Sequence, residues 1–361
     1  MKQKTLKNFT FLLILLIIGF TNCVDKKTDA PKNIIIFIGD GMGVSQLYAA
    51  MTVHGQKFNI EEFPYAGLIK TYSADNYITD SGAAGTAIAA GEKTNNGMIG
   101  VKPDGTPVSS ITETANKNGL ASGVVSTSTI THATPASFVA HNAGRGNVEA
   151  IANDFLNGTI DVFIGGGENH FRRRRDSVDL TIELKEQGFD VVYTMEDLKS
   201  FTSTKIAGLL AKGDMPKAAE GRMGMLREMT IKAIETLSKN KKGFVLMVEG
   251  SMIDWGAHAG DIEYTVAEVI DFDDAVGAAL DFAKADGKTL VVVTADHETG
   301  GLALTGGDIA SKTVTAKFTS NDHTATMVPV FSFGPGAERF SGINENTFFY
   351  GEFVELLGLE K

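Results

Sequence analysis

The stretch NIIIFIGD, residues 33 to 40, is an apolar run that ends in a glycine and an aspartate. Comparable runs alternate with helical patterns at ASGVVST (121 to 127), TIDVFIGGG (159 to 167), GFDVVYT (188 to 194), GFVLMVEG (243 to 250), TLVVVTADH (289 to 297) and MVPVFSFGP (327 to 335). Strands this uniformly apolar are typical of a sheet covered on both faces. We therefore predict an α/β fold, with a doubly wound, mainly parallel sheet and helices on both faces in a single compact domain.

Two of the intervening segments have clear helical signals. Ser110 and Glu113 have the spacing of a capping box, so a helix is expected from Ser110 to Lys117. From Ile262 onward, apolar residues keep helical spacing over a long segment. The acids interspersed in it are expected on a solvent-exposed face: Glu263, Asp271, Asp274 and Asp281.

Composition limits the classes of function. The chain has 361 residues, 43% of them apolar and 21% charged, which predicts a substantial folded core rather than disorder. The formal net charge is -11, and it becomes -14 without residues 1–22, which contain three lysines and no acid. A specific nucleic-acid partner is excluded on this ground, and the acids are either a soluble surface or ligands gathered around cations.

The first residues have the layout of an export signal, with a basic start, an apolar run and a polar end over residues 1–22. Residues 23–32 are expected to be a linker. Cys23, the only cysteine, excludes an intramolecular disulfide and resembles the lipidated cysteine of bacterial lipoproteins. We expect an exported protein, either periplasmic or anchored to the cell envelope through a lipid on Cys23, and the alternative is ordinary cleavage nearby.

The run of four arginines at residues 172–175 stands out in an acidic chain. A solvated loop is the favoured interpretation, and a patch for phosphate or lipid headgroups is the alternative.

Residues able to bind metals occur where several predicted strands end. Asp40 ends the first run, Glu249 lies at the end of another, and Asp296 and His297 end a third. Open α/β sheets bind ligands at the carboxyl ends of their strands, so these side chains are expected to share one crevice. Asp254, in the segment VEGSMIDWGAHAGD, lies four residues before a histidine and could bind Zn with it from one helical face.

The stretch ITDSGAAGTAIAAGEKT, residues 78 to 94, predicts a helix that begins near Asp80 and Ser81. The small residues that follow would let this helix pack closely, and its N-terminus would favour a phosphate group beside Ser81.

Six motifs in the same order resemble those of bacterial alkaline phosphatases, over about residues 33 to 335: GDGMG, TDSGAAGTA, HATPASFVAHNAGR, VEGSMIDWGAH, VTADHETGG and the late His323. The resemblance implies a catalytic domain over residues 33–361. It also implies hydrolysis of phosphate monoesters through a phosphoserine at Ser81, with release of alcohol and inorganic phosphate. Two Zn²⁺ and one Mg²⁺ per subunit and a possible homodimer are further implications.

The resemblance also implies the role of each site residue. One zinc would be held by Asp254, His258 and His323, the other by Asp40, Asp296 and His297 with Ser81, and the magnesium by Asp40, Thr134 and Glu249. Arg145 would grip the phosphate. His132 and Trp255 occupy positions that vary in the family: with no cation at 255 we expect weaker phosphate retention, and His132 could contact a magnesium-bound water, bind the metal or simply pack.

Other functions fit the sequence less well. A sulfatase is disfavoured because Ser81 lacks the C-x-P-x-R or S-x-P-x-R context, and a phosphodiesterase because Thr134, Glu249 and Arg145 complete a monoester-binding set. A protein that binds phosphate without turnover remains an alternative of another class. Because little sequence separates TADHETGG from His323, we expect a compact core with an open cleft.

Overall fold

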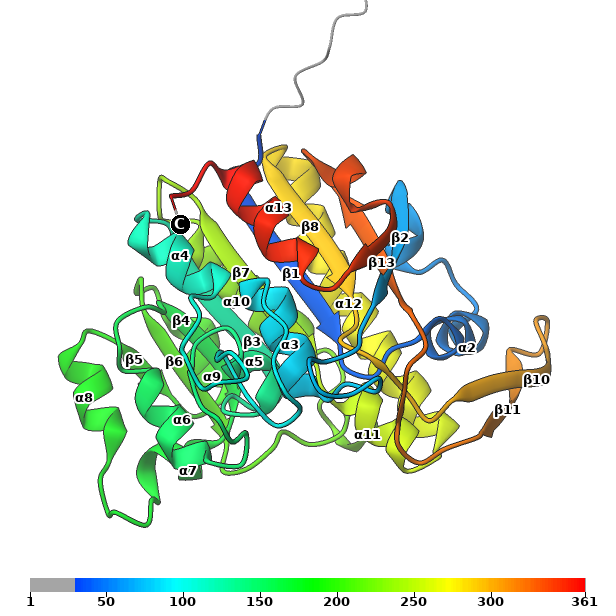
Figure 1. Ribbon diagram of the computed structural model, residues 1–361, viewed down its shortest axis with the longest axis horizontal. Helices are drawn as coiled ribbons and strands as arrows, with labels where there is room; N and C mark the ends of the chain where they lie inside the picture. Colours follow the sequence, from blue (N-terminus) through cyan, green and yellow to red (C-terminus); the bar gives the residue numbers. More distant parts are fainter. Residues whose placement is uncertain (1–29, 361) are drawn as a thin grey trace, which may run out of the picture.

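The computed structural model describes residues 30–360, so the predicted export signal and Cys23 lie outside the described residues. A ten-stranded sheet forms the centre of the molecule (Figure 1). In spatial order its strands are β14 (Gly342–Glu345), β2 (Tyr65–Lys70), β13 (Val328–Phe333), β8 (Thr289–Thr294), β1 (Asn33–Gly39), β7 (Phe244–Gly250), β3 (Ala121–Thr129), β4 (Val162–Gly166), β6 (Ile206–Ala211) and β5 (Asp190–Val192).

This sheet confirms the predicted doubly wound α/β class. Each of the seven apolar runs contains a strand, and all neighbours are parallel except that β13 runs antiparallel to both β8 and β2. Strands β2, β6 and β14 were not predicted. β2 and β14 lie toward one edge of the sheet and are largely exposed, so they lack the continuous apolar signal of the central strands.

Helices cover both faces of the sheet (Figure 1). One layer contains α2 (Val44–His54), α10 (Met225–Leu237), α11 (Met252–His258) and α12 (Ile262–Asp286), and the other contains α3 (Ser81–Ala90), α4 (Ile111–Lys117), α5 (Ala133–Ala136) and α13 (Phe348–Leu357). The remaining helices are α6 (Val148–Asp154), α7 (Glu168–Arg172), α8 (Leu180–Glu186) and α9 (Met195–Ser200). The predicted capping box is confirmed, since Ser110 and Glu113 each accept from the other's backbone N–H at the start of α4.

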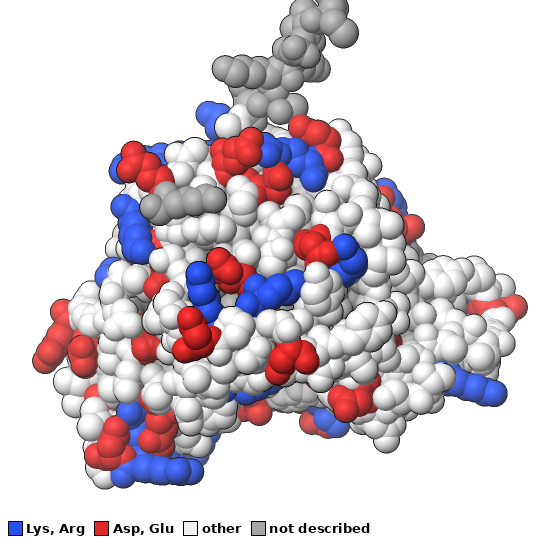
Figure 2. All heavy atoms as spheres, viewed as in Figure 1, with Lys and Arg blue, Asp and Glu red and all other residues white. Residues whose placement is uncertain are grey.

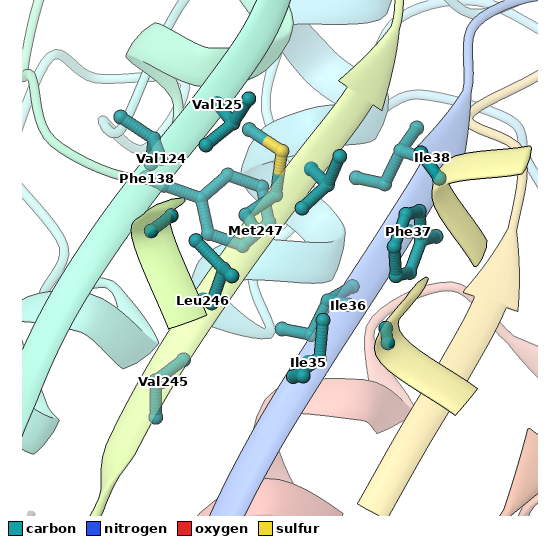
Figure 3. Close-up of a cluster of buried hydrophobic side chains, with 14 of the residues drawn as sticks. Ile35, Ile36, Phe37, Ile38, Val124, Val125, Phe138, Val245, Leu246 and Met247 are labelled. Carbon is teal, nitrogen blue, oxygen red and sulfur yellow. The ribbon is translucent and has the colours of Figure 1, made fainter. Parts of the chain in front are cut away.

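The core is continuous through the middle of the sheet. Side chains of the adjacent strands β1, β7 and β3 lie side by side there, and Phe138 packs against them (Figure 3). All seven residues of β1 and all seven of β7 are buried, as expected for strands covered on both faces. This rigid centre fixes the positions of the loops at the strand ends.

The prediction for the acids of the long helix is wrong at one position. Glu263, Asp274 and Asp281 are exposed, but Asp271 is fully buried. Arg222, also fully buried, donates hydrogen bonds to Asp271 and to Glu268 one turn earlier on α12. A buried carboxylate is tolerated when it is paired and hydrogen-bonded, and the partner lies 49 residues away in sequence.

Charges of both signs are interspersed over the face shown in Figure 2, which has no large patch of one sign.

In the arginine run, Arg174 is buried and donates to the Glu149 carbonyl and to the Asp176 carboxylate, whereas the other three side chains are exposed. Arg172 is the last residue of α7, and residues 173–175 form a surface loop that the buried Arg174 holds in place.

A hairpin of β10 (Leu302–Asp308) and β11 (Thr313–Phe318) projects from the body beside α2 (Figure 1).

Within residues 30–360, no helix combines the length and apolar character needed to cross a membrane.

Candidate active site

The proposed metal-binding residues meet at the carboxyl ends of four adjacent parallel strands, β8, β1, β7 and β3. Asp40 directly follows β1 and Glu249 is the penultimate residue of β7. Asp296 and His297 follow β8, and His132 and Thr134 lie just beyond β3. Sheet order therefore brings together residues that are more than 200 positions apart.

Ser81 lies against a first cluster formed by Asp40, Asp296 and His297. The ligand atoms of these three residues lie within 4.8 Å of one another. His297 Nε2 is 3.2 Å from Ser81 Oγ, 3.2 Å from Asp296 Oδ2 and 3.5 Å from Asp40 Oδ1. All four side chains are buried, so their polar atoms have little access to bulk water.

A second cluster contains Asp254, His258 and His323. Asp254 and His258 lie four residues apart on one face of α11, with His258 Nε2 3.2 Å from Asp254 Oδ2. His323 Nε2 lies 3.1 Å from His258 Nε2. His323 reaches this position because β12 (His323–Thr324) pairs with β9 (Glu298–Thr299), which sets His323 opposite Thr299.

The histidines present Nε2 to these clusters because their Nδ1 atoms have other partners. His258 Nδ1 lies 2.6 Å from the Asn321 carbonyl and His323 Nδ1 lies 2.9 Å from the Thr79 carbonyl, so each Nδ1 carries the proton. A carbonyl on Nδ1 leaves Nε2 unprotonated in the neutral ring and available to a metal.

A third cluster joins Asp40 to Glu249 and His132, whose ligand atoms also lie within 4.8 Å of one another. Burial raises the pKa of Glu249, and the Thr134 hydroxyl, on α5, acts against this rise. The His132 ring packs edge-to-face on Trp255, with centroids 6.0 Å apart. Asp40 belongs to two clusters and therefore links them.

The polar atoms of these clusters fit divalent cations. Both oxygens of Asp40, one oxygen each of Glu249 and Asp296, Thr134 Oγ1 and His132 Nδ1 are buried and find no hydrogen-bond partner among the described residues. Unpartnered buried carboxylates are costly, and oxygen donors of this kind are the ligands of Mg²⁺ and Zn²⁺. The remaining unpartnered atoms in residues 30–360 are scattered elsewhere, so the concentration at these strand ends is specific.

The electrostatics of the third cluster favour a bound cation. Burial raises the pKa of Asp40 well above its ordinary value, and the neighbouring carboxylates, Asp296 first, raise it further. Burial raises the pKa of Glu249 to about 7. Burial, with help from the Arg145 charge, lowers the pKa of His132 to about 4, so this imidazole is neutral near pH 7. Cations would relieve the repulsion among the acids.

Ser81 is the first residue of α3, as the sequence predicted, and Asp80 caps the helix by accepting from Ala83 N at 3.0 Å. All ten residues of α3 are buried. Small side chains make this possible: a Cβ on Gly82 would lie 2.8 Å from the Met98 carbonyl oxygen. The helix therefore packs directly on the loop that follows it.

Arg145 is held beside Ser81 by residues that sequence reasoning missed. Its NH1 donates to Asp80 Oδ2 at 2.7 Å, and its backbone N–H donates to the Gly97 carbonyl. Gly97 N also donates to Asp80 Oδ2, and Asn96 Oδ1 accepts from Asp80 N. Asp80 has a helix-cap signal in the sequence, but nothing local indicates its second role on Arg145.

Thr299 is another residue without a sequence signal. Its hydroxyl donates to Asp254 Oδ1 and lies 3.2 Å from His297 Nδ1, so it bridges the first and second clusters. Gly41 allows this approach, because a Cβ there would lie 2.7 Å from Thr299 Oγ1. All twelve predicted site residues thus belong to one contiguous region.

Comparisons with known proteins agree with this geometry. Residues 31–317 match the model of the alkaline phosphatase family. Alkaline phosphatase 4 of Bacillus subtilis is 37% identical, over 89% of this chain and 88% of that one. The alkaline phosphatase of Escherichia coli is 32% identical, over 93% and 88% of the two chains.

Solved structures show the same similarity. The alkaline phosphatase of the Antarctic bacterium TAB5 superposes with a TM-score of 0.88 and 42% identity, covering 92% of this chain and all of that one. A variant of the TAB5 enzyme with aspartate in place of a histidine is described with Mg bound in its M3 site. The chain therefore belongs to the alkaline phosphatase family and is a metal-dependent hydrolase of phosphate monoesters.

Proposed function

We propose that Ser81 is the nucleophile of this phosphatase and that the three clusters hold two Zn²⁺ and one Mg²⁺. Asp254, His258 and His323 would hold one zinc, and Asp40, Asp296 and His297 the other. Asp40, Thr134 and Glu249 would hold the magnesium. The observation that supports this assignment is the convergence of unpartnered ligand atoms beside the Ser81 hydroxyl.

When bound, such cations lower the pKa of a hydroxyl or water and neutralise charge on phosphate oxygens. Ser81 Oγ loses its proton and attacks phosphorus, the bond to the ester oxygen breaks, and the alcohol leaves with that electron pair and a proton. Water then attacks the phosphoserine, which releases inorganic phosphate and restores Ser81. The α3 N-terminus favours the negative charge that both steps bring to Ser81.

Arg145 binds two phosphate oxygens through its planar guanidinium, a bidentate geometry that lysine cannot match. The ion pair with Asp80 restricts the guanidinium before substrate arrives, so less conformational entropy is lost on binding.

Trp255 and His132 tune phosphate affinity in this proposal. His132 Nε2 lies 3.5 Å from Arg145 NH2, and its Nδ1 is unpartnered among the described atoms, so the ring is available to the magnesium or to a water bound there. Trp255 supplies no cation to the phosphate. Trp255→Lys should therefore lower the inhibition constant of inorganic phosphate, and an unchanged constant would contradict this role.

The nucleophile assignment is tested with Ser81→Ala. We expect turnover of p-nitrophenyl phosphate to fall by several orders of magnitude while zinc and magnesium content, measured by plasma mass spectrometry, stays near that of the wild type. An unchanged rate would exclude Ser81 as the nucleophile. Comparison with bis-p-nitrophenyl phosphate separates monoesterase from diesterase activity, and higher activity on the diester would contradict the proposal.

We further infer that residues 33–361 form the catalytic domain and that residues 1–22 direct export, to the periplasm or to a lipid anchor on Cys23. Incorporation of labelled palmitate into the wild type and its loss in Cys23→Ser would support the anchor, whereas equal labelling would exclude this cysteine. A homodimer is proposed by analogy with the family, and light scattering of the purified protein tests it.

A further inference from the structure

Three buried serine side chains gather at one oxygen of the Glu249 carboxylate. Ser126 and Ser128 lie on β3, Ser251 follows β7, and all three are fully buried. Ser126 Oγ lies 2.5 Å from Glu249 Oε2, 3.0 Å from Ser128 Oγ and 2.9 Å from Ser251 Oγ. Ser251 Oγ lies 3.0 Å from Ser128 Oγ, so the three hydroxyls close a serine triangle.

The direction of one hydrogen bond in this triangle follows from chemistry. A carboxylate that binds a cation is ionised and only accepts, so Ser126 donates its single proton to Glu249 Oε2. Ser126 Oγ accepts from the backbone N–H of Ser128 at 3.0 Å, and Ser251 donates its hydroxyl proton to Ser128 Oγ at 3.0 Å. Ser251 is fixed in turn, because its backbone N–H donates to Thr127 Oγ1 at 2.9 Å. The Ser126 hydroxyl is therefore locked toward Glu249.

This arrangement divides the two oxygens of Glu249 between two tasks. Oε2 is occupied by Ser126, whereas Oε1 is buried and has no hydrogen-bond partner in residues 30–360. The Glu249 carboxylate also belongs to the cluster with Asp40 and His132. Mg²⁺ demands near-octahedral geometry, so rotation of this carboxylate would weaken its binding.

We propose that Ser126, supported by Ser128 and Ser251, is a positioning residue that sets the orientation of Glu249 for magnesium. This inference rests on the proposed magnesium site. Outer partners of metal-binding carboxylates typically affect metal affinity by about 10- to 100-fold.

A purely structural role for the triangle makes a different prediction. Loss of a buried hydroxyl would then lower stability without changing magnesium affinity. Ser122 provides the matched control: it lies four residues earlier on β3, is fully buried and donates to the Thr159 carbonyl at 2.8 Å, on the opposite end of the strand from Glu249. Ser122→Ala removes a comparable hydrogen bond remote from the candidate site.

The test is magnesium titration of the zinc-loaded, magnesium-depleted proteins by isothermal titration calorimetry. Ser126→Ala should raise the magnesium dissociation constant by about 10- to 100-fold, with zinc content unchanged, and Ser122→Ala should stay within about twofold of wild type. A Ser126→Ala constant within twofold of wild type, or an equal loss in Ser122→Ala, would overturn the inference. Ser126→Cys keeps the shape with a weaker donor and provides a second variant if the alanine form does not fold.

Glu249→Gln separates this inference from the proposed function. If Glu249→Gln binds magnesium as the wild type does, the magnesium assignment itself is wrong, and the positioning role falls with it. If Glu249→Gln loses magnesium but Ser126→Ala retains it, only the positioning role is wrong. Ser251→Ala should give a smaller loss than Ser126→Ala, because it removes support while leaving the donor in place.

Discussion

Gly82, the residue after Ser81, tests how tightly the nucleophile position depends on packing. A Cβ at Gly82 would lie 2.8 Å from the Met98 carbonyl oxygen, whereas ordinary contacts begin at 3.4 Å. Gly82→Ala must therefore move the first turn of α3 or the opposing loop by about 0.6 Å, the difference between these values. A misplacement of about 1 Å can cost about 100-fold in rate, so we expect kcat/KM to fall by about tenfold.

The expected loss of activity comes without a large loss of stability. Alanine is favoured over glycine in a helix by about 1 kcal/mol, which offsets part of an overpacking cost of about 1–3 kcal/mol. Steady-state kinetics on p-nitrophenyl phosphate and thermal unfolding by circular dichroism measure the two effects. Gly351→Ala is the control, since Gly351 also lies in a helix, α13, and nothing lies within 4 Å of its Cβ position. A Gly82→Ala enzyme within twofold of wild-type kcat/KM would refute the packing argument.

Three further outcomes are expected. Arg222→Met leaves Glu268 and Asp271 buried without their cation, so the free energy of unfolding should fall by about 3–5 kcal/mol in denaturant titration, and an unchanged midpoint would contradict this pairing. The hydrogen bond with Glu113 raises the pKa of His141 above 6.5, and, against the effect of burial, His141 lowers the pKa of Glu113 below 4.5. The contribution of His141 to the free energy of unfolding is complete below pH 6.5 and is lost as pH rises through its folded pKa. The contribution of Glu113 is complete above pH 4.5 and is lost as pH falls through its folded pKa. Glu113→Gln should therefore lower the Tm most between pH 4.5 and pH 6.5 and least at alkaline pH. A loss of Tm that does not depend on pH would exclude the Glu113–His141 pair as the cause of that loss. Removal of metals with EDTA should lower the Tm and abolish turnover, and Zn²⁺ with Mg²⁺ should restore both, since ions at about 100 times their Kd stabilise by about 2.7 kcal/mol; a Tm indifferent to EDTA would argue against structural coupling to the site.

The central strands and the helix ends were predictable because their signals are local. An apolar run such as Ile34 to Ile38, in which every residue except Phe37 is β-branched, favours a strand covered on both faces wherever it lies in the chain. The Ser110–Glu113 box and the Asp80 cap act within four residues, and both occur as predicted. Ordered motifs also named the candidate site residues, since each motif keeps its chemistry in a short segment.

What only the tertiary structure decided depends on partners distant in sequence. Strand order, with β1 between β7 and β8, determines that Asp40 lies beside both Glu249 and His297. Asp271 has the same sequence pattern as its exposed neighbours on α12, and only the approach of Arg222 makes it a buried ion pair. Ser126 likewise looks like any strand serine until β7 places Glu249 against it. Local sequence sets backbone conformation and the available chemical groups, whereas burial and hydrogen-bond partners arise from long-range packing that no short segment encodes.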